Sequence, residues 1–321
     1  MSIIWLGIVL LILFLFYKLR NKNTVIEEST NNLNDFLVVK PERHSILEIP
    51  KVVWLYWHDL DHIPSIVSKC IDSMIYFNRD YIINILDDSR FKELTGIDIN
   101  QAFSKTNNKS YQKKSDFIRL NIIYRYGGIW LDASIICTKS LNWIHDIQKS
   151  KKFPDKTYYE TICFMAPDTE NNPVIDSWFI ASVPRSLFIF DWMNEFNDSL
   201  QYTNDAQYCK EIISNYPVPT NLKKYLPYLT IHLCNWVVRY NNPNLYKIYF
   251  LSSTEEGAPF YYINKYKWNS RKMLKSFIHY PKLCDMKLFK LTNGMRHDVA
   301  TTNYRYKTNN AIINYVLDNI Y

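Results

Sequence analysis

The sequence predicts an α/β protein whose core is a largely parallel sheet. Three observations lead to this fold. A strand, an amphipathic helix and a second strand follow one another between residues 49 and 88, a further helix runs directly into a strand near residue 130, and both later strands reach aspartates. Strand, helix and strand in succession imply parallel pairing through a right-handed crossover.

The first of these units begins with "IPKVVWLYW", residues 49–57, an aromatic and β-branched run that is typical of a strand. Residues 65–78 then place apolar side chains at helical spacing. Residues 81–88, "YIINILDD", return to strand character and end in two aspartates. We therefore expect the two strands to pair in parallel, with the helix covering one face.

A second helix is expected over residues 115–126. Ser115 is placed to cap its N-terminus, and Gly127-Gly128 is placed to end it. Asp116 and Arg119 lie three residues apart, so their side chains project from the same side of the first turn. Taken alone, such a pair is ordinarily a structural ion pair, and paired glycines are ordinarily a helix stop.

The run "IWLDASIIC", residues 129–137, predicts another strand, with Asp132 at the end of its first half. Ligands of open α/β sheets bind at this end of the strands. Residues 279–298 are loop-rich, and the sequence alone does not place them. Elsewhere in the second half we expect a strand over residues 158–167 and helices over residues 173–183, 187–200 and 225–240.

Composition excludes several classes of protein. The 321 residues carry a formal net charge of +7, but the lysines are spread in short groups and no nucleic-acid motif is present, so nucleic acid is not an expected partner. The six cysteines are widely spaced and form no zinc-binding pattern. They fit reduced, mostly buried thiols.

The N-terminus predicts one transmembrane helix over residues 1–20. The first 17 residues carry no charged side chain, which is near the lower limit for crossing a bilayer. A signal peptide is the alternative, but the basic start and the small-residue cleavage site are missing. Lys18, Arg20 and Lys22 follow the apolar run, so the positive-inside rule places the body of this single-pass membrane protein on the cytoplasmic side. We expect residues 21–45 to form a polar stalk between the membrane and the domain.

An aspartate motif at a strand end suggests chemistry on a nucleotide diphosphate. Breaking a bond to such a group leaves negative charge, which magnesium or manganese held by oxygen ligands can stabilise. Alternate residues of a strand point the same way, so an Asp-x-Asp pair can hold such an ion. Here Asp132 offers a carboxylate and Ser134 only a hydroxyl. The negative charge available to hold a metal is therefore reduced.

The run "KSDFIRLNIIYRYGGIWLDASIICTKSL", residues 114–141, resembles the signature of the capsular polysaccharide synthesis glycosyltransferases, relatives of glycosyltransferase family 32, the DXD sugar-binding group. The resemblance extends over residues 47–293, from the opening strand to "FKLT". It implies a GT-A fold, which is Rossmann-like, with added helices over residues 46–300. Residues 301–321 would then be a C-terminal tail.

The resemblance also implies roles for individual residues. Asp116 and Arg119 would grip the donor sugar and the diphosphate, and together with Asp132 they are the expected catalytic residues. Asp132 would also meet the ribose and the water shell of the metal. Trp130 would pack beside the sugar or ribose, although a tryptophan on an apolar strand is usually a core residue. Trp57 would stack on the uracil ring, although it could equally be a core residue.

The chain departs from the family pattern at Ser134, which stands where a second aspartate would bind the metal directly. Asp132 and Ser134 are still the expected ligands of manganese or magnesium. Lys290 could neutralise phosphate in place of some metal charge, and Asn293 or His297 could supply a late ligand.

Two functions follow. The first is a membrane-anchored glycosyltransferase that moves a sugar from a nucleotide-sugar, a UDP-sugar by resemblance, to a polysaccharide, glycoprotein or glycolipid acceptor. It would be metal-assisted and, by analogy with family 32, retaining. The second is a nucleotide- or glycan-binding membrane protein that keeps the fold and has lost the chemistry. The sequence does not indicate the donor sugar, the acceptor or the oligomeric state.

Overall fold

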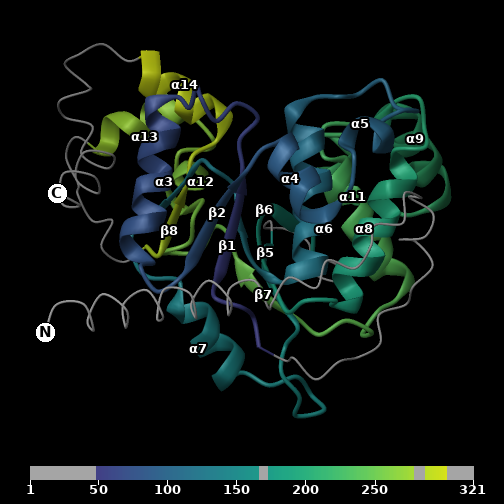
Figure 1. The fold of residues 1–321 in the computed structure, drawn as a ribbon, viewed down its shortest axis with the longest axis horizontal. Helices are drawn as coiled ribbons and strands as arrows, with labels where there is room; N and C mark the ends of the chain where they lie inside the picture. The colour runs from purple at the N-terminus through teal and green to yellow at the C-terminus, as the bar shows by residue number, and fades with distance from the viewer. Residues whose placement is uncertain (1–47, 166–172, 278–285, 302–321) are drawn as a thin grey trace, which may run out of the picture. The chain divides into compact units, whose positions relative to one another are not determined.

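The structure is a computed structural model that describes residues 48–165, 173–277 and 286–301 (Figure 1). The predicted anchor over residues 1–20, the stalk over 21–45 and the tail beyond residue 301 lie outside the described residues and remain predictions. Within the described part of the chain, no helix is both long and apolar enough to cross a bilayer.

The core of the fold is a six-stranded mixed sheet. Its parallel pairs are β2 with β1, β1 with β3, and β5 with β7, whereas β6 runs antiparallel to both of its neighbours. The predicted α/β class and the parallel pairing of the first two strands are confirmed. In spatial order the strands are β2 (Ile82–Leu86), β1 (Val52–Tyr56), β3 (Gly128–Leu131), β6 (Ile175–Ser182), β5 (Thr161–Met165) and β7 (Ile248–Ser252).

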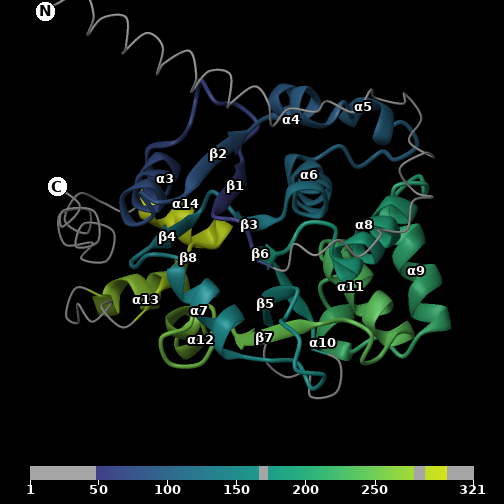
Figure 2. The same cartoon turned by 60° about the horizontal axis from the view of Figure 1, so that its bottom comes forward.

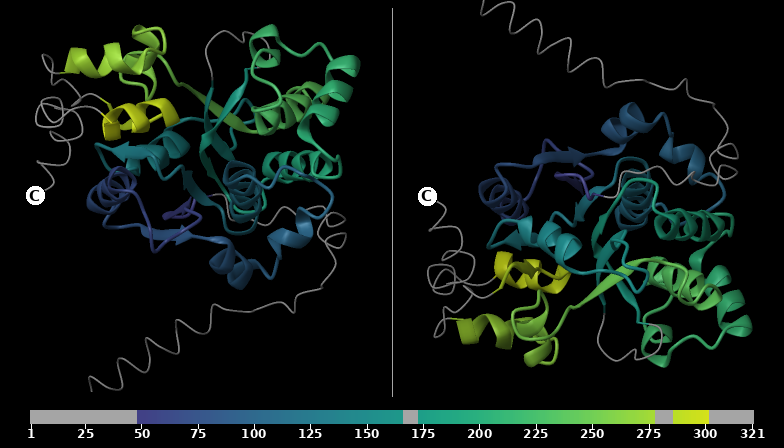
Figure 3. Two further views of the ribbon diagram at one scale, coloured as in Figure 1. Left: turned by 90° about the horizontal axis from the view of Figure 1, so that it is seen from above. Right: turned by 90° about the horizontal axis from the view of Figure 1, so that it is seen from below.

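Two groups of helices lie on opposite sides of this sheet (Figures 1 and 2), and Figure 3 shows the yellow and the green helices separated in the same way. The first group accompanies a two-stranded ribbon and comprises α3 (Ser65–Phe77), α12 (Tyr261–Lys265), α13 (Ser270–Phe277), α14 (Asn293–Thr301) and the strands β4 (Ile135–Cys137) and β8 (Leu288–Lys290). The second comprises α6 (Tyr111–Tyr126), α8 (Leu187–Ser199), α9 (Asp205–Asn215) and α11 (Thr230–Asn241). The remaining helices are α4 (Asp88–Thr95), α5 (Ile99–Ala102), α7 (Asn142–Ser150) and α10 (Thr220–Lys223).

Alternation along the strands builds the core between the sheet and α3. Val53, Leu55, Ile129 and Leu131 are each fully buried and belong to one apolar cluster. Successive strand residues point to opposite faces, so Trp130 lies on the other face. The cysteines follow the prediction of free, buried thiols at the described positions Cys70, Cys137, Cys163, Cys209 and Cys234.

One element differs in kind from its prediction. Residues 173–183 are not a helix but contain the strand β6, all eight residues of which are buried. This strand lies between β3 and β5, and helices α6 and α11 pack on it. A strand buried on both faces has no polar alternation, so its sequence cannot be told from a buried helix by periodicity.

Other elements differ in their bounds. Helix α6 begins at Tyr111, because Ser110 and not Ser115 is its N-cap, with the Ser110 side chain accepting a hydrogen bond from the Lys113 amide at 3.3 Å. The run over residues 129–137 is broken by a turn, and its halves, β3 and β4, join different sheets. The long helix expected over residues 225–240 begins only at residue 230. The unplaced C-terminal run forms β8 and α14.

The two glycines after α6 bring β3 against β1 without a connecting loop. Gly127 and Gly128 have φ angles of +61° and +92°, which residues other than glycine rarely adopt. A Cβ atom at Gly128 would lie 2.6 Å from the carbonyl oxygen of Val52 in β1. Because the chain turns here within two residues, the position of Asp132 is fixed relative to α6.

Candidate functional site

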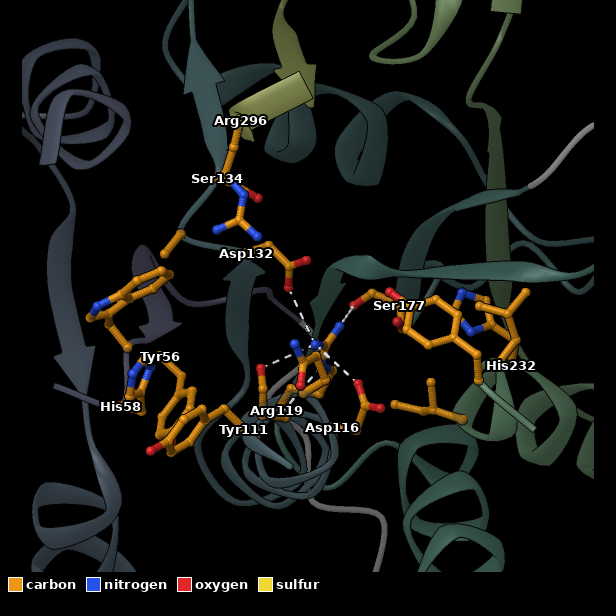
Figure 4. Close-up of a pocket in the computed structure, with 17 residues that line it drawn as sticks. Tyr56, His58, Tyr111, Asp116, Arg119, Asp132, Ser134, Ser177, His232 and Arg296 are labelled. Atoms are coloured by element: carbon orange, nitrogen blue, oxygen red, sulfur yellow. Dashed lines mark hydrogen bonds and ion pairs between the residues drawn. The ribbon is translucent and has the colours of Figure 1, made fainter. Parts of the chain in front are cut away.

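A cavity of about 250 Å³ opens where β1 and β3 end (Figure 4). Six segments of the chain supply its walls. The lining residues are Tyr56, Trp57 and His58 after β1, Tyr111, Gln112, Ser115, Asp116 and Arg119 of α6, Asp132, Ala133 and Ser134 after β3, Ser177 of β6, Tyr228, Leu229, Ile231 and His232 at α11, and Arg296 of α14.

Arg119 connects most of the polar groups on one side of the cavity. Its Nη2 lies 3.1 Å from Asp116 Oδ1 and 3.3 Å from Asp132 Oδ1. The same nitrogen donates to Ser115 Oγ at 3.1 Å, and Nη1 donates to the carbonyl oxygen of Ser177. The planar guanidinium carries five donors in a fixed geometry, so these bonds hold it in one orientation. Arg119 is therefore pre-positioned between two carboxylates.

Asp132 is held from two sides. Lys290 Nζ lies 2.6 Å from its Oδ2, and the indole Nε1 of Trp130 donates to its Oδ1 at 3.2 Å. Burial raises the pKa of Asp132, but the nearby cations Lys290 and Arg119 outweigh this effect and lower the pKa to about 2. Asp132 is therefore ionised throughout the physiological range.

Asp116 behaves differently although it shares Arg119. Its side chain is only 16% exposed. Burial raises its pKa to about 6, and the attraction of Arg119 opposes this rise only in part. The two carboxylates of the cavity therefore titrate far apart, and only Asp116 changes its charge near neutral pH.

Trp57 and Trp130 are placed differently from one another. Trp57 lines the cavity, its ring centroid lies 6.0 Å from the guanidinium carbon of Arg296, and its indole Nε1 has no hydrogen-bond partner within the described residues. Trp130 is fully buried and does not line the cavity. The guanidinium carbon of Arg119 lies 5.1 Å from its ring centroid. This placement corrects the expected contact of Trp130 with a sugar, because its indole supports Arg119 and Asp132 from beneath.

Two lining residues at α11 have no signal in the sequence. His232 of α11 is partly buried, and its Nδ1 has no partner in the part of the chain that the structure describes. Burial, together with Arg119, lowers the pKa of His232 to about 3, so the imidazole is neutral. Tyr228 stands just before the same helix and is 77% exposed. They reach the cavity only through the packing of α11 against the sheet, which no local pattern reports.

The residues expected to bind a metal do not fit a tightly held divalent ion. Lys290 Nζ donates to both Asp132 Oδ2 and Ser134 Oγ, at 2.6 and 2.9 Å. Across residues 48–165, 173–277 and 286–301 there is no group of three or more His, Cys, Asp or Glu that could hold a metal ion. Asn293 and His297 are exposed on α14 and do not line the cavity. Magnesium is usually bound by one or two carboxylates together with waters and substrate phosphates, so the obstacle here is the lysine already paired with Asp132.

The fold and the cavity thus define an α/β protein with a charged pocket at the carboxyl ends of parallel strands, the position at which open sheets bind ligands. The chain belongs to the capsular polysaccharide synthesis protein family, whose model matches residues 13–212. This membership agrees with the predicted family and with the predicted class of enzyme, a glycosyltransferase.

Comparison with curated proteins gives no match. Among solved structures, the chain is similar to the PaToxG glycosyltransferase, with 13% identity, a TM-score of 0.38 and coverage of 85% of this chain and 86% of that one. It is also similar to the glycosyltransferase GlyE of Streptococcus pneumoniae TIGR4, with 9% identity, a TM-score of 0.37 and coverage of 85% and 63%.

Proposed function

We propose that the protein is a GT-A glycosyltransferase that moves a sugar from a UDP-sugar to a polysaccharide, glycoprotein or glycolipid acceptor. The observation that carries this proposal is the meeting of Trp57, Asp116, Arg119 and Asp132 in one cavity at the ends of β1 and β3. Trp57, whose indole nitrogen has no hydrogen-bond partner within the described residues, distinguishes this cavity from an ordinary cluster of surface ion pairs.

The cavity offers separate partners for each part of the donor. The ring of Trp57 is accessible for stacking on uracil, a contact that contributes about 1–3 kcal/mol. Asp116 and Asp132 can accept hydrogen bonds from hydroxyls of the sugar and ribose. Arg119 and Arg296 can stabilise the negative charge that grows on the diphosphate as the glycosidic bond breaks.

The acceptor would enter beside Tyr228, whose exposed ring stands at the edge of the cavity. Aromatic rings suit the apolar faces of sugars as well as flat bases. Retention of configuration is proposed only by analogy with family 32. Anchoring through residues 1–20, with the catalytic domain on the cytoplasmic side, is proposed from the charge pattern alone.

Release of UDP from a panel of UDP-sugars by the purified full chain tests the proposal. We expect slow release with at least one donor, and a loss of about 100-fold or more in Asp132→Asn, because the carboxylate that holds Arg119 and can accept hydrogen bonds from donor hydroxyls would be neutralised. Asp80→Asn is the matched control, since Asp80 forms an exposed ion pair with Lys51 away from the cavity. The absence of both turnover and binding with every donor in the panel would refute the proposal.

A binding protein without catalysis is the second candidate. It is favoured by the neutral side chain of Ser134 and by the hydrogen bond that Lys290 donates to its hydroxyl. The two functions separate in one titration. A binding-only protein would gain thermal stability with UDP but would release no UDP from any UDP-sugar.

A further inference from the structure

The Asp132-Ala133-Ser134 turn is held by a lysine that lies more than 150 residues later in the chain. In the β4–β8 ribbon, Ile135 pairs with Lys290. The amide of Leu291 also donates to the carbonyl oxygen of Ser134 at 3.0 Å. The backbone register therefore places Lys290 beside the turn, and its position does not depend on a flexible loop.

The ammonium of Lys290 contacts both side chains that would bind a metal, those of Asp132 and Ser134. It lies 2.6 Å from Asp132 Oδ2 and 2.9 Å from Ser134 Oγ, and its side chain is only 10% exposed. A divalent ion bound between the same two oxygens would displace this ammonium and leave it buried without its carboxylate. Leaving a buried charge uncompensated is strongly unfavourable.

The cations that face the cavity are Arg119 and Arg296, whereas Lys290 lies behind Asp132 and Ser134 and does not line it. The charged lining residues are Asp116, Arg119, Asp132 and Arg296, whose formal charges cancel when both carboxylates are ionised. Lys290 adds one positive charge. The site thus carries a formal charge of +1 before any ligand enters.

Arg296 has donors to spare. It belongs to α14, directly after β8, and its Nη2 donates to Asn293 Oδ1 at 3.2 Å. Its Nε is buried and has no partner within the described residues. In Figure 4 the Arg296 guanidinium reaches toward Asp132 from the side opposite to Arg119. A phosphate beside Trp57 would give these donors a charged acceptor.

We propose that this site binds the diphosphate of its donor without a divalent cation. Lys290 neutralises Asp132 and fixes Ser134, in place of the manganese or magnesium that the sequence predicts, and Arg296 and Arg119 meet the charge of the phosphates. The proposal rests on the function proposed above, because it concerns the same nucleotide site.

Calorimetric titration of the full chain with UDP, in excess EDTA or in excess MnCl₂, tests this inference. Wild-type protein is expected to bind UDP in EDTA and in MnCl₂ with affinities that differ by no more than about twofold. Lys290→Met should weaken binding in EDTA about 10- to 100-fold, the range for a lost charged hydrogen bond, and MnCl₂ should restore part of the loss. The matched control is Lys287→Met, an exposed lysine on the same segment that does not line the cavity.

Arg296→Met keeps the inference testable if Lys290→Met fails to fold, because Arg296 forms no buried ion pair within the described residues. It should weaken UDP binding about tenfold or more in either buffer. Binding of UDP by wild-type protein only with MnCl₂ would overturn the inference and leave the nucleotide site intact. Equal effects of Lys290→Met and Lys287→Met would also overturn it. No UDP binding in either buffer would refute the proposed function as well.

Discussion

Two segments build the charged cavity in different ways. Residues 111–134 form a continuous helix, glycine turn and strand, and they supply Asp116, Arg119 and Asp132. Residues 288–301 form a short strand and a helix that reach the same place through the β4–β8 ribbon, and they supply Lys290 and Arg296. The positions of the site residues in the first segment follow from their spacing along the sequence. Those in the second segment are set by the pairing of β8 with β4. A sequence motif can therefore lack a residue that the site needs, because a distant segment of the chain supplies it.

The largest effect is expected from removing the centre of the first segment. Arg119→Met leaves Asp116 and Asp132 close together without the cation between them, so unfolding free energy should fall by about 3–5 kcal/mol. UDP release should fall by about 1,000-fold. Chemical denaturation and initial rates measure the two effects, and exposed Arg79→Met is the control. If Arg119→Met kept its activity, the residues of the second segment, and not Arg119, would be central to the site.

Glycine substitutions compare the backbones of the two segments. Gly128→Ala places a Cβ atom 2.6 Å from the Val52 carbonyl at a φ angle of +92°, so we expect a loss of about 2–4 kcal/mol in stability. Gly294→Ala, in α14, has no neighbour within 4 Å and should stabilise the helix by up to about 1 kcal/mol. Urea denaturation of both variants measures the difference. Equal losses would contradict the close approach of β3 to β1.

The pH dependence separates the two carboxylates. The folded-state pKa of Asp116, about 6, lies above the ordinary aspartate value of 3.8, so its ionisation destabilises the fold above pH 6, and this penalty shrinks as the pH falls and disappears below pH 3.8. Asp132, with a pKa of about 2, instead stabilises the fold above pH 4 and loses this contribution at lower pH.

We therefore expect Asp116→Asn to be about 1–3 kcal/mol more stable than wild type at pH 8 and to lose most of this advantage at pH 4.5. Denaturant midpoints at the two pH values measure this change. UDP release by wild type should also fall on the acidic side with an apparent pKa near 6. A difference in stability that did not depend on pH would show that Asp116 does not titrate in this range.

The smallest effect is expected at the mouth of the cavity. Tyr228→Ala should raise the KM for the acceptor about 2- to 10-fold, which corresponds to the loss of one aromatic contact. Tyr225→Ala is the matched control, because Tyr225 is 53% exposed and does not line the cavity. Acceptor kinetics at saturating donor provide the measurement. Equal KM values for the two variants would place the acceptor elsewhere.

Local spacing predicted the parts of the site that lie near one another in the sequence. The three-residue separation of Asp116 and Arg119 and the glycine stop place these side chains and Asp132 around one cavity, and the strand over residues 49–57 brings Trp57 there. Each feature depends on contacts within a turn or within one crossover unit, which periodicity and capping rules describe.

The remaining parts depend on packing between distant segments. Nothing near His232 or Arg296 indicates a ligand, because α11 and α14 reach the cavity only after the sheet has formed. The burial of β6 on both faces concealed its strand character. Trp130 shares a strand face with Asp132, but it is fully buried beneath Asp132 and Arg119, which both contact its indole.

The ribbon between β4 and β8 has a consequence for synthesis. Proteins emerge from the ribosome from the N-terminus, and domains fold as units during or after this process. A nascent chain that ends before residue 288 already contains the whole recognisable motif but has no partner strand for residues 135–137 and no ammonium for Asp132. Nucleotide binding should therefore arise only after the segment that carries Lys290 and Arg296 has left the ribosome.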